Sequence, residues 1–142
     1  MSQENVTRLR RFLEGWDPKS DLEGWKRGEY SFDPAFLDPE LEYEDTVLPD
    51  HVGEVYRGYE GVARATERWL EPFESLAVVL ERIVGNGDRL VSIHRWRAKA
   101  QHTGIELEGS LSYVWTFTEG RVTHFKSYWE AADALEAARL SE

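Results

Sequence analysis

The chain has 142 residues, a mass of 16.5 kDa and a formal net charge of -10, and it contains no cysteine. This length suits one domain over residues 1–142, large enough to bury a core without disulfides. The acidic balance disfavours nucleic acid and membranes as partners, because both are bound mainly through clustered Lys and Arg. The polar opening segment lacks the apolar stretch of a signal peptide, so we expect a cytoplasmic protein.

Histidine spacing gives no indication of a metal centre. The four histidines are His51, His94, His102 and His124, and they form no HExxH or other short ligand motif. The glycines of the YRGYEG segment are not followed by the Lys of a phosphate-binding loop. We therefore expect neither a metal nor a cofactor.

The first half of the chain predicts helices around one strand. Apolar residues from Val6 to Trp16 recur with helical spacing and predict a first helix that Pro18 ends. A short second helix is expected from Asp21 to Gly28, a single turn in the DPAFLDP segment, and a further helix over about residues 60–70. Between them, the run ELEYED has the period of two that is typical of a strand.

The second half of the chain predicts four strands in succession. Period-two patterns cover about residues 77–84, 89–100, 105–117 and 122–130, separated by the turn sequences GNGD, HTG and TEG. The alanine-rich end is read as a short helix or a tail. Helices followed by an antiparallel meander indicate an α+β fold.

The ELEYED strand directs an acid toward the core. Leu41, Tyr43 and Asp45 share one face, whereas the three glutamates of the run share the other. Burying a carboxylate is costly, so such a group is often functional. Asp45 is therefore the leading candidate for chemistry, and its alternative role is to cap the next loop through the backbone amides of Val47 or Leu48.

The two hairpin turns decide which side chains meet. If Thr103 and Gly104 form a two-residue loop, the pairs are Ala98 with Gly109, Trp96 with Leu111, and His94 with Tyr113. A three-residue loop would instead turn Ile93 and Arg95 inward.

For the next hairpin we favour a three-residue TEG loop with Gly120 in the left-handed region, which pairs Tyr113 with Phe125 and Gly109 with Trp129. A two-residue loop would place His124 and Tyr128 on the inner face instead.

Motifs along nearly the whole chain resemble the nuclear-transport-factor-2-like superfamily, in particular SnoaL-like polyketide cyclases and ketosteroid isomerases. The motifs are SQENVTRLRRFLEGW, LDPELEYED, VYRGYEGV, GDRLVSIHRWRAKAQHTGIELEG and VWTFTEGRVTHFKSYWEAADALEAA. The resemblance implies a cone-shaped, strongly curved antiparallel sheet with two or three helices on its concave face.

The same resemblance implies roles for individual residues. The strand reading V-E-D in ketosteroid isomerases ends with the general base, a role that would fall to Asp45 here. The later-strand acid of that family matches Tyr113, and Phe12 and Trp16 stand in the first helix where the family has a Tyr. The Arg-x-Asp pair of limonene epoxide hydrolases is replaced by a strand segment without an acid, running from His94 to Arg97.

Together these features predict a pocket for a small apolar or aromatic ligand. Its expected lining is rich in rings and consists of Trp16, Tyr43, Trp69, Trp96, Trp115, Phe125 and Trp129. In the catalytic hypothesis Asp45 removes a proton beside a carbonyl, and His94 and Tyr113 stabilise the enolate. In the structural alternative His94 and Tyr113 share a core hydrogen bond, and the tryptophans only pack.

The outer face of the sheet suggests a homodimer. Arg95, Arg97 and Lys99 alternate on that face, where they are either solvated or part of a subunit contact, and the resemblance implies a two-fold dimer there. Three functions remain open from the sequence: an isomerase or cyclase, a noncatalytic small-molecule binding module, and a protein-interaction domain.

Overall fold

The structure is a computed structural model that describes residues 2–30, 32–47, 53–85 and 87–139. These residues form four helices: α1 (Ser2–Glu14), α2 (Pro18–Lys26), α3 (Gly58–Leu70) and α4 (Ala131–Ala138). They also form six strands: β1 (Leu37–Asp45), β2 (Glu54–Arg57), β3 (Phe73–Val84), β4 (Arg89–Ala100), β5 (Glu106–Thr118) and β6 (Arg121–Tyr128).

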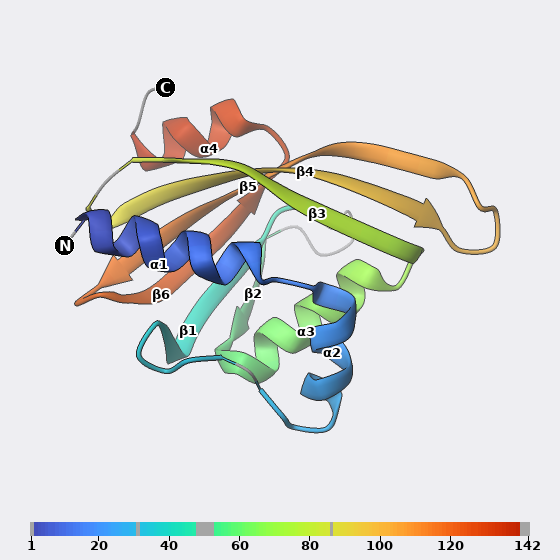
Figure 1. Cartoon of the computed structure of the whole chain (residues 1–142), viewed down its shortest axis with the longest axis horizontal. Coiled ribbons are helices and arrows are strands. Elements are labelled where there is room, and N and C mark those ends of the chain that lie inside the picture. The colour runs from blue at the N-terminus through green and yellow to red at the C-terminus, as the bar shows by residue number, and fades with distance from the viewer. Residues whose placement is uncertain (1, 31, 48–52, 86, 140–142) are drawn as a thin grey trace.

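All six strands belong to one curved sheet with the order β2-β1-β6-β5-β4-β3 (Figure 1). β1 runs parallel to β6, and every other neighbouring pair is antiparallel. The predicted α+β fold with an antiparallel meander is therefore confirmed. The short strand β2, expected to be part of an irregular loop, was missed because four residues are too few to show a period.

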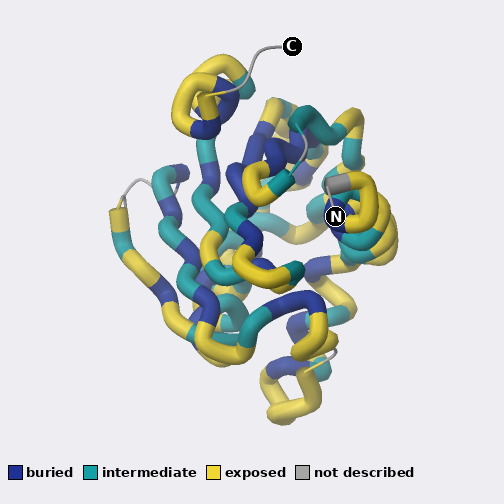
Figure 2. Tube along the Cα trace, turned by 90° about the vertical axis from the view of Figure 1, so that its left-hand side faces the viewer, coloured by how far each residue is buried: buried dark blue, intermediate teal, exposed yellow. Residues whose placement is uncertain are grey.

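The N-terminal helices cover the concave face because each carries an apolar side. The α1 residues Leu9 and Leu13 are buried against the sheet, and Leu9 is fully inaccessible. Together with strand residues from Leu37 to Val122 they form the main core. Figure 2 shows the buried segments of the strands running beneath exposed loops and helix surfaces.

The start of α2 differs from the sequence prediction. Asp17, and not Asp21, caps the helix by accepting a hydrogen bond from the backbone N–H of Ser20 (3.3 Å). Pro18, expected only to end α1, occupies the first turn of α2, where its missing N–H costs no hydrogen bond.

Helix α4 lies on the convex face of the sheet, opposite the other helices. Its residues Ala134, Leu135 and Ala138 pack against Val91, Ile93 and Val114 of β4 and β5. Part of the outer face considered for dimerisation is therefore already covered within the chain.

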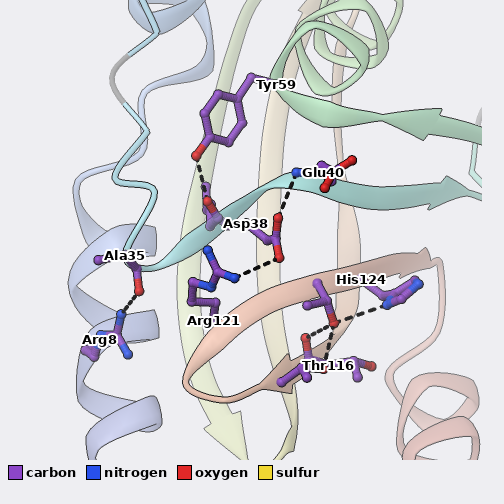
Figure 3. A network of polar contacts seen from close by, with 11 residues as sticks. Arg8, Ala35, Asp38, Glu40, Tyr59, Thr116, Arg121 and His124 are labelled. Atoms are coloured by element: carbon purple, nitrogen blue, oxygen red, sulfur yellow. Dashed lines mark hydrogen bonds and ion pairs between the residues drawn. The ribbon is translucent and has the colours of Figure 1, made fainter.

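A set of polar contacts fastens the start of β1 to its neighbours (Figure 3). The Arg8 guanidinium donates to the carbonyl oxygens of Ala35 and Gly120, both at 2.6 Å, and thus links α1 to two turns. The Tyr59 hydroxyl of α3 donates to the Leu37 carbonyl at 2.6 Å, and Arg121 pairs with Asp38 at 3.4 Å (Figure 3). These contacts hold α1 and α3 against the start of β1.

The β4–β5 hairpin has a different register from the predicted one. Residues 101–104 form the loop, which is closed by the Ala100 N–H bonded to the Ile105 carbonyl. The observed pairs are Ala98 with Leu107, Trp96 with Gly109, and His94 with Leu111. The predicted pairing was wrong by two residues, because the loop is two residues longer than expected. A shift of two preserves the faces, so His94 and Trp96 still point to the concave side.

The β5–β6 hairpin also departs from the expected loop. Glu119 and Gly120 form a two-residue turn, both with positive φ, so the favoured three-residue loop was wrong. A β-bulge between Thr116 and Phe117 then restores the expected faces. Phe125 consequently lies opposite Trp115, not Tyr113.

Candidate functional site

A hollow of about 60 Å³ lies between the N-terminal helices and the concave face of the sheet. α1, both ends of α2 and the connecting residues Trp16 and Phe32 contribute part of its wall, α3 contributes a second part, and β1, β3, β5 and β6 contribute the rest. Its wall is mostly apolar and ring-rich, and it is formed by Phe12, Leu13, Trp16, Pro18, Trp25, Phe32, Tyr43, Val62, Ala65, Thr66, Trp69, Leu70, Leu76, Val78, Leu111, Tyr113, Trp115 and Phe125. A space of this size corresponds to about two water molecules, at roughly 30 Å³ each in the liquid.

The structure places the predicted lining residues in two groups. Trp16, Tyr43, Trp69, Trp115 and Phe125 line the hollow. The other two predicted residues, Trp96 and Trp129, lie outside the wall and are in ring contact with each other (6.4 Å between centroids).

The wall of the hollow includes two neighbouring phenols, Tyr43 and Tyr113. The two rings lie 6.3 Å apart, and Tyr43 also stacks on Phe125 at 4.4 Å. Burial, the neighbouring Tyr113 and the Asp45 carboxylate raise the pKa of Tyr43 well above its ordinary value. Burial and Asp45 likewise raise the pKa of Tyr113. Both phenols therefore stay protonated at any working pH, and the single hydroxyl proton of Tyr43 is shared with the Asp45 carboxylate.

Asp45 lies fully buried next to this pair of phenols. Its Oδ1 accepts the Val47 backbone N–H at 2.8 Å, which is the loop-capping role considered from the sequence; Leu48, the other candidate for that bond, lies outside the described residues. Asp45 is not part of the described wall of the hollow. Its carboxylate interacts directly with Tyr43, which does line the hollow.

Ser127 supports Tyr43 from β6. Its hydroxyl accepts the Thr46 backbone N–H at 3.1 Å and also interacts with the Tyr43 hydroxyl. This contact joins the end of β1 to β6 and fixes the tyrosine between a serine and a carboxylate.

His94 belongs to a separate buried chain of hydrogen bonds. The Trp115 indole N–H donates to the Ser92 hydroxyl oxygen at 2.8 Å, and His94 Nε2 lies 2.8 Å from the same oxygen. The Tyr113 ring packs edge-on to His94 at 5.6 Å between centroids. Burial lowers the pKa of His94 to about 4, so the ring is neutral at physiological pH. In the structural alternative considered from the sequence, Tyr113 was the hydrogen-bond partner of His94; in the structure this partner is Ser92.

Sequence reasoning missed several residues of the site. Ser92 is fully buried and has the inner-face parity of its strand, a signal that could have found it. Val62 and Thr66 line the hollow from α3, as the four-residue spacing of that helix allows. Trp25 of α2 could not be placed there from sequence, because the position of a short helix depends on its packing.

The described residues contain no cluster of three or more histidine, aspartate or glutamate side chains with the geometry of a metal site. None of the described helices has both the length and the apolar character needed to cross a membrane.

Comparison with known proteins identifies the family. Residues 9–125 match the model of the SnoaL-like domain. The chain belongs to the SnoaL-like domain family. No curated protein matches this SnoaL-like chain significantly.

Solved structures share the fold of this SnoaL-like domain at low sequence identity. An NTF2-like protein of unknown function from Burkholderia pseudomallei has 20% identity and a TM-score of 0.63, over 97% of this chain and 98% of its own. A protein described as a SnoaL-like polyketide cyclase from Jannaschia has 19% identity and a TM-score of 0.66, over 99% and 95%. TerC, co-crystallised with polyporic acid, has 13% identity and a TM-score of 0.61, over 84% and 92%.

Proposed function

We propose that this SnoaL-like domain binds a small, planar, mostly apolar molecule that carries an oxygen acceptor at one end. The observation that carries the proposal is the ring-lined hollow whose wall includes the two buried phenols Tyr43 and Tyr113. Burial holds both phenols protonated, so they suit a carbonyl oxygen better than a cation. The crystallisation of TerC with polyporic acid supports a small-molecule ligand for this fold.

Binding requires the rings of the wall to move. The hollow of about 60 Å³ is smaller than a two-ring ligand, and Trp16 and Trp69 are only partly buried at its edge. Rotation of either indole would enlarge the hollow, because both side chains line it. The free protein is therefore expected in a contracted state that a ligand expands.

A bicyclic ketone tests the proposal. We expect 2-tetralone to bind saturably in calorimetry and to bind more tightly than tetralin, which has the same rings without the oxygen. Tyr113→Phe removes one donor and should weaken 2-tetralone binding about twofold to tenfold, without changing tetralin binding. No saturable binding of either compound, or an equal effect of the variant on both, would contradict the proposal.

A second candidate function is enolisation, with Asp45 as the general base. The observation in its favour is the burial of this carboxylate beside two phenols that remain donors. Asp45 would take a proton from the carbon next to the carbonyl and return it to the substrate, while Tyr43 and Tyr113 hydrogen-bond the enolate oxygen. This reaction requires the carboxylate to reach the hollow when the wall expands.

Deuterium exchange distinguishes catalysis from binding alone. The enzyme hypothesis predicts that the protein accelerates exchange of the α-protons of 2-tetralone in D₂O, and that Asp45→Asn abolishes the acceleration. The asparagine retains an oxygen for the Val47 amide, so the fold and ligand affinity should persist. Exchange at the buffer rate in the wild type, with binding intact, would identify a noncatalytic binding module.

Dimerisation through the outer sheet face remains a proposal. Arg95, Arg97 and Lys99 lie exposed on that face beyond the area covered by α4, and Arg97 already pairs with Glu108 at 3.5 Å. A monomer mass in small-angle scattering at working concentration would overturn this dimer.

A further inference from the structure

The projecting part of the β4–β5 hairpin leaves apolar side chains exposed on its concave side. This part of the hairpin extends past α2 and α3 (Figure 1). Leu107 of β5, which has inner-face parity, is 41% exposed, and Trp129, directly after β6, is 46% exposed. Together with Phe73 and Trp96 they form what we call the rim cluster.

The two faces of this hairpin differ in chemistry. The opposite face carries charged side chains in ion pairs, Arg97 with Glu108 at 3.5 Å and Lys99 with Glu74 at 3.7 Å. The strands thus alternate between charged and apolar residues even where no helix covers the apolar side. Such an alternation is expected where something else covers the apolar face.

The rim cluster is continuous with the hollow through Trp69. This indole lines the hollow, and it also contacts Trp96 edge-on at 6.3 Å and Phe73 at 6.0 Å between centroids. Trp96 in turn contacts Trp129 at 6.4 Å. A row of rings therefore leads from the inside of the hollow to the exposed hairpin.

Gly109 fixes the central ring of this row. A Cβ atom at position 109 would lie only 2.8 Å from Cζ2 of Trp96, so the indole rests directly on the β5 backbone. The Trp96 Nε1–H also donates to the Ser110 carbonyl at 3.2 Å. The position of Trp96 is thus set by a close approach that any larger residue at position 109 would prevent.

The size of the exposed patch argues for a small molecule as its occupant and against a second protein chain. If each of the four side chains exposes about 100 Å² of surface, the patch covers about 400 Å². This is roughly half of the ~800 Å² that each partner buries in a stable protein interface. All four members are uncharged, and the hollow next to them is too small for more than one end of a ligand.

We propose that the rim cluster is an outer subsite for the apolar, ring-containing end of a ligand whose oxygen-bearing end occupies the hollow. This inference rests on the proposed function of the hollow. It extends the ligand class from a small ketone to an elongated molecule with a polar head and an aromatic tail.

The test compares two probes: 2-tetralone, and 2-tetralone extended by a phenyl ring at C6. We expect the wild type to bind the extended probe at least about tenfold more tightly than the short one. Leu107→Ser removes exposed apolar surface and Gly109→Ala displaces Trp96, so each should bring the ratio of the two dissociation constants toward one. Val79→Ser is the matched control, since Val79 is 62% exposed on the other face of the sheet, and it should keep the wild-type ratio.

Each outcome bears on a different claim. Equal affinity for the two probes, or a gain that survives Leu107→Ser, overturns the outer subsite while the hollow keeps its function. Failure of both probes to bind overturns the proposed function and the subsite with it. A change from dimer to monomer on Leu107→Ser in light scattering would identify the cluster as a subunit contact and would also overturn the subsite.

Discussion

His94 makes the stability of this protein depend on pH in a way that its surroundings determine. The ring is 1% exposed and packs beside Tyr113, and burial lowers its pKa from 6.5 to about 4. The unfolded chain therefore binds a proton at His94 at a pH where the folded chain does not. Above pH 6.5 this histidine does not reduce the unfolding free energy. Between pH 6.5 and about pH 4 the unfolding free energy falls as the pH falls, and below about pH 4 the histidine causes no further change.

The magnitude follows from the size of the shift. A difference of about 2.5 pKa units corresponds to about 3 kcal/mol of unfolding free energy, since one unit is worth about 1.4 kcal/mol. This is a large part of the total unfolding free energy of a typical domain, which is about 5–15 kcal/mol.

Urea unfolding at a series of pH values measures the effect. His94→Gln cannot be protonated, so the wild type should lose about 3 kcal/mol more than the variant between pH 7 and pH 4. The carboxylates titrate in both proteins, so the difference isolates the histidine. His124→Gln is the matched control, because it is the same substitution at a side chain that is 60% exposed. Identical pH profiles for the wild type and His94→Gln would refute the burial argument.

Two further predictions concern close contacts in the core. Gly61→Ala would place Cβ 3.0 Å from the Tyr56 carbonyl carbon and should lower the unfolding free energy by about 1–3 kcal/mol, whereas Gly15→Ala meets nothing nearer than 3.5 Å and should lower it less; equal effects in denaturant titrations would count against the packing at Gly61. Trp115→Phe removes the indole donor to Ser92 and should cost about 1–3 kcal/mol in the same assay, and a neutral result would show that this hydrogen bond adds nothing to stability.

The alternation of side chains along the strands predicted more of the site than the assignment of the hairpin loops did. Asp45 was placed inward because it alternates in step with the apolar residues of ELEYED and not with the glutamates, and the residue is fully buried as expected. His94 was placed on the concave face despite a register error of two residues, since such an error does not change the face. Phe125 was placed correctly although the loop was wrong, because a bulge that no sequence signal reveals compensated for it.

Contacts between distant elements could not be predicted in the same way. Trp96 and Trp129 have the parity of pocket residues, but the hairpin that carries Trp96 extends past the helices, and a strand's reach relative to a helix depends on packing. The partner of His94 was also missed. Ser92 and Tyr113 share its face, and only the three-dimensional structure shows that the ring nitrogen meets Ser92.

The most direct test of the central claim is a crystal structure of the protein soaked with 2-tetralone. The proposed function predicts the ring system inside an enlarged hollow, with the ketone oxygen about 2.5–3.2 Å from the hydroxyl of Tyr43 or Tyr113. A structure in which the rings of the wall keep their contracted arrangement and the ketone lies elsewhere would contradict it.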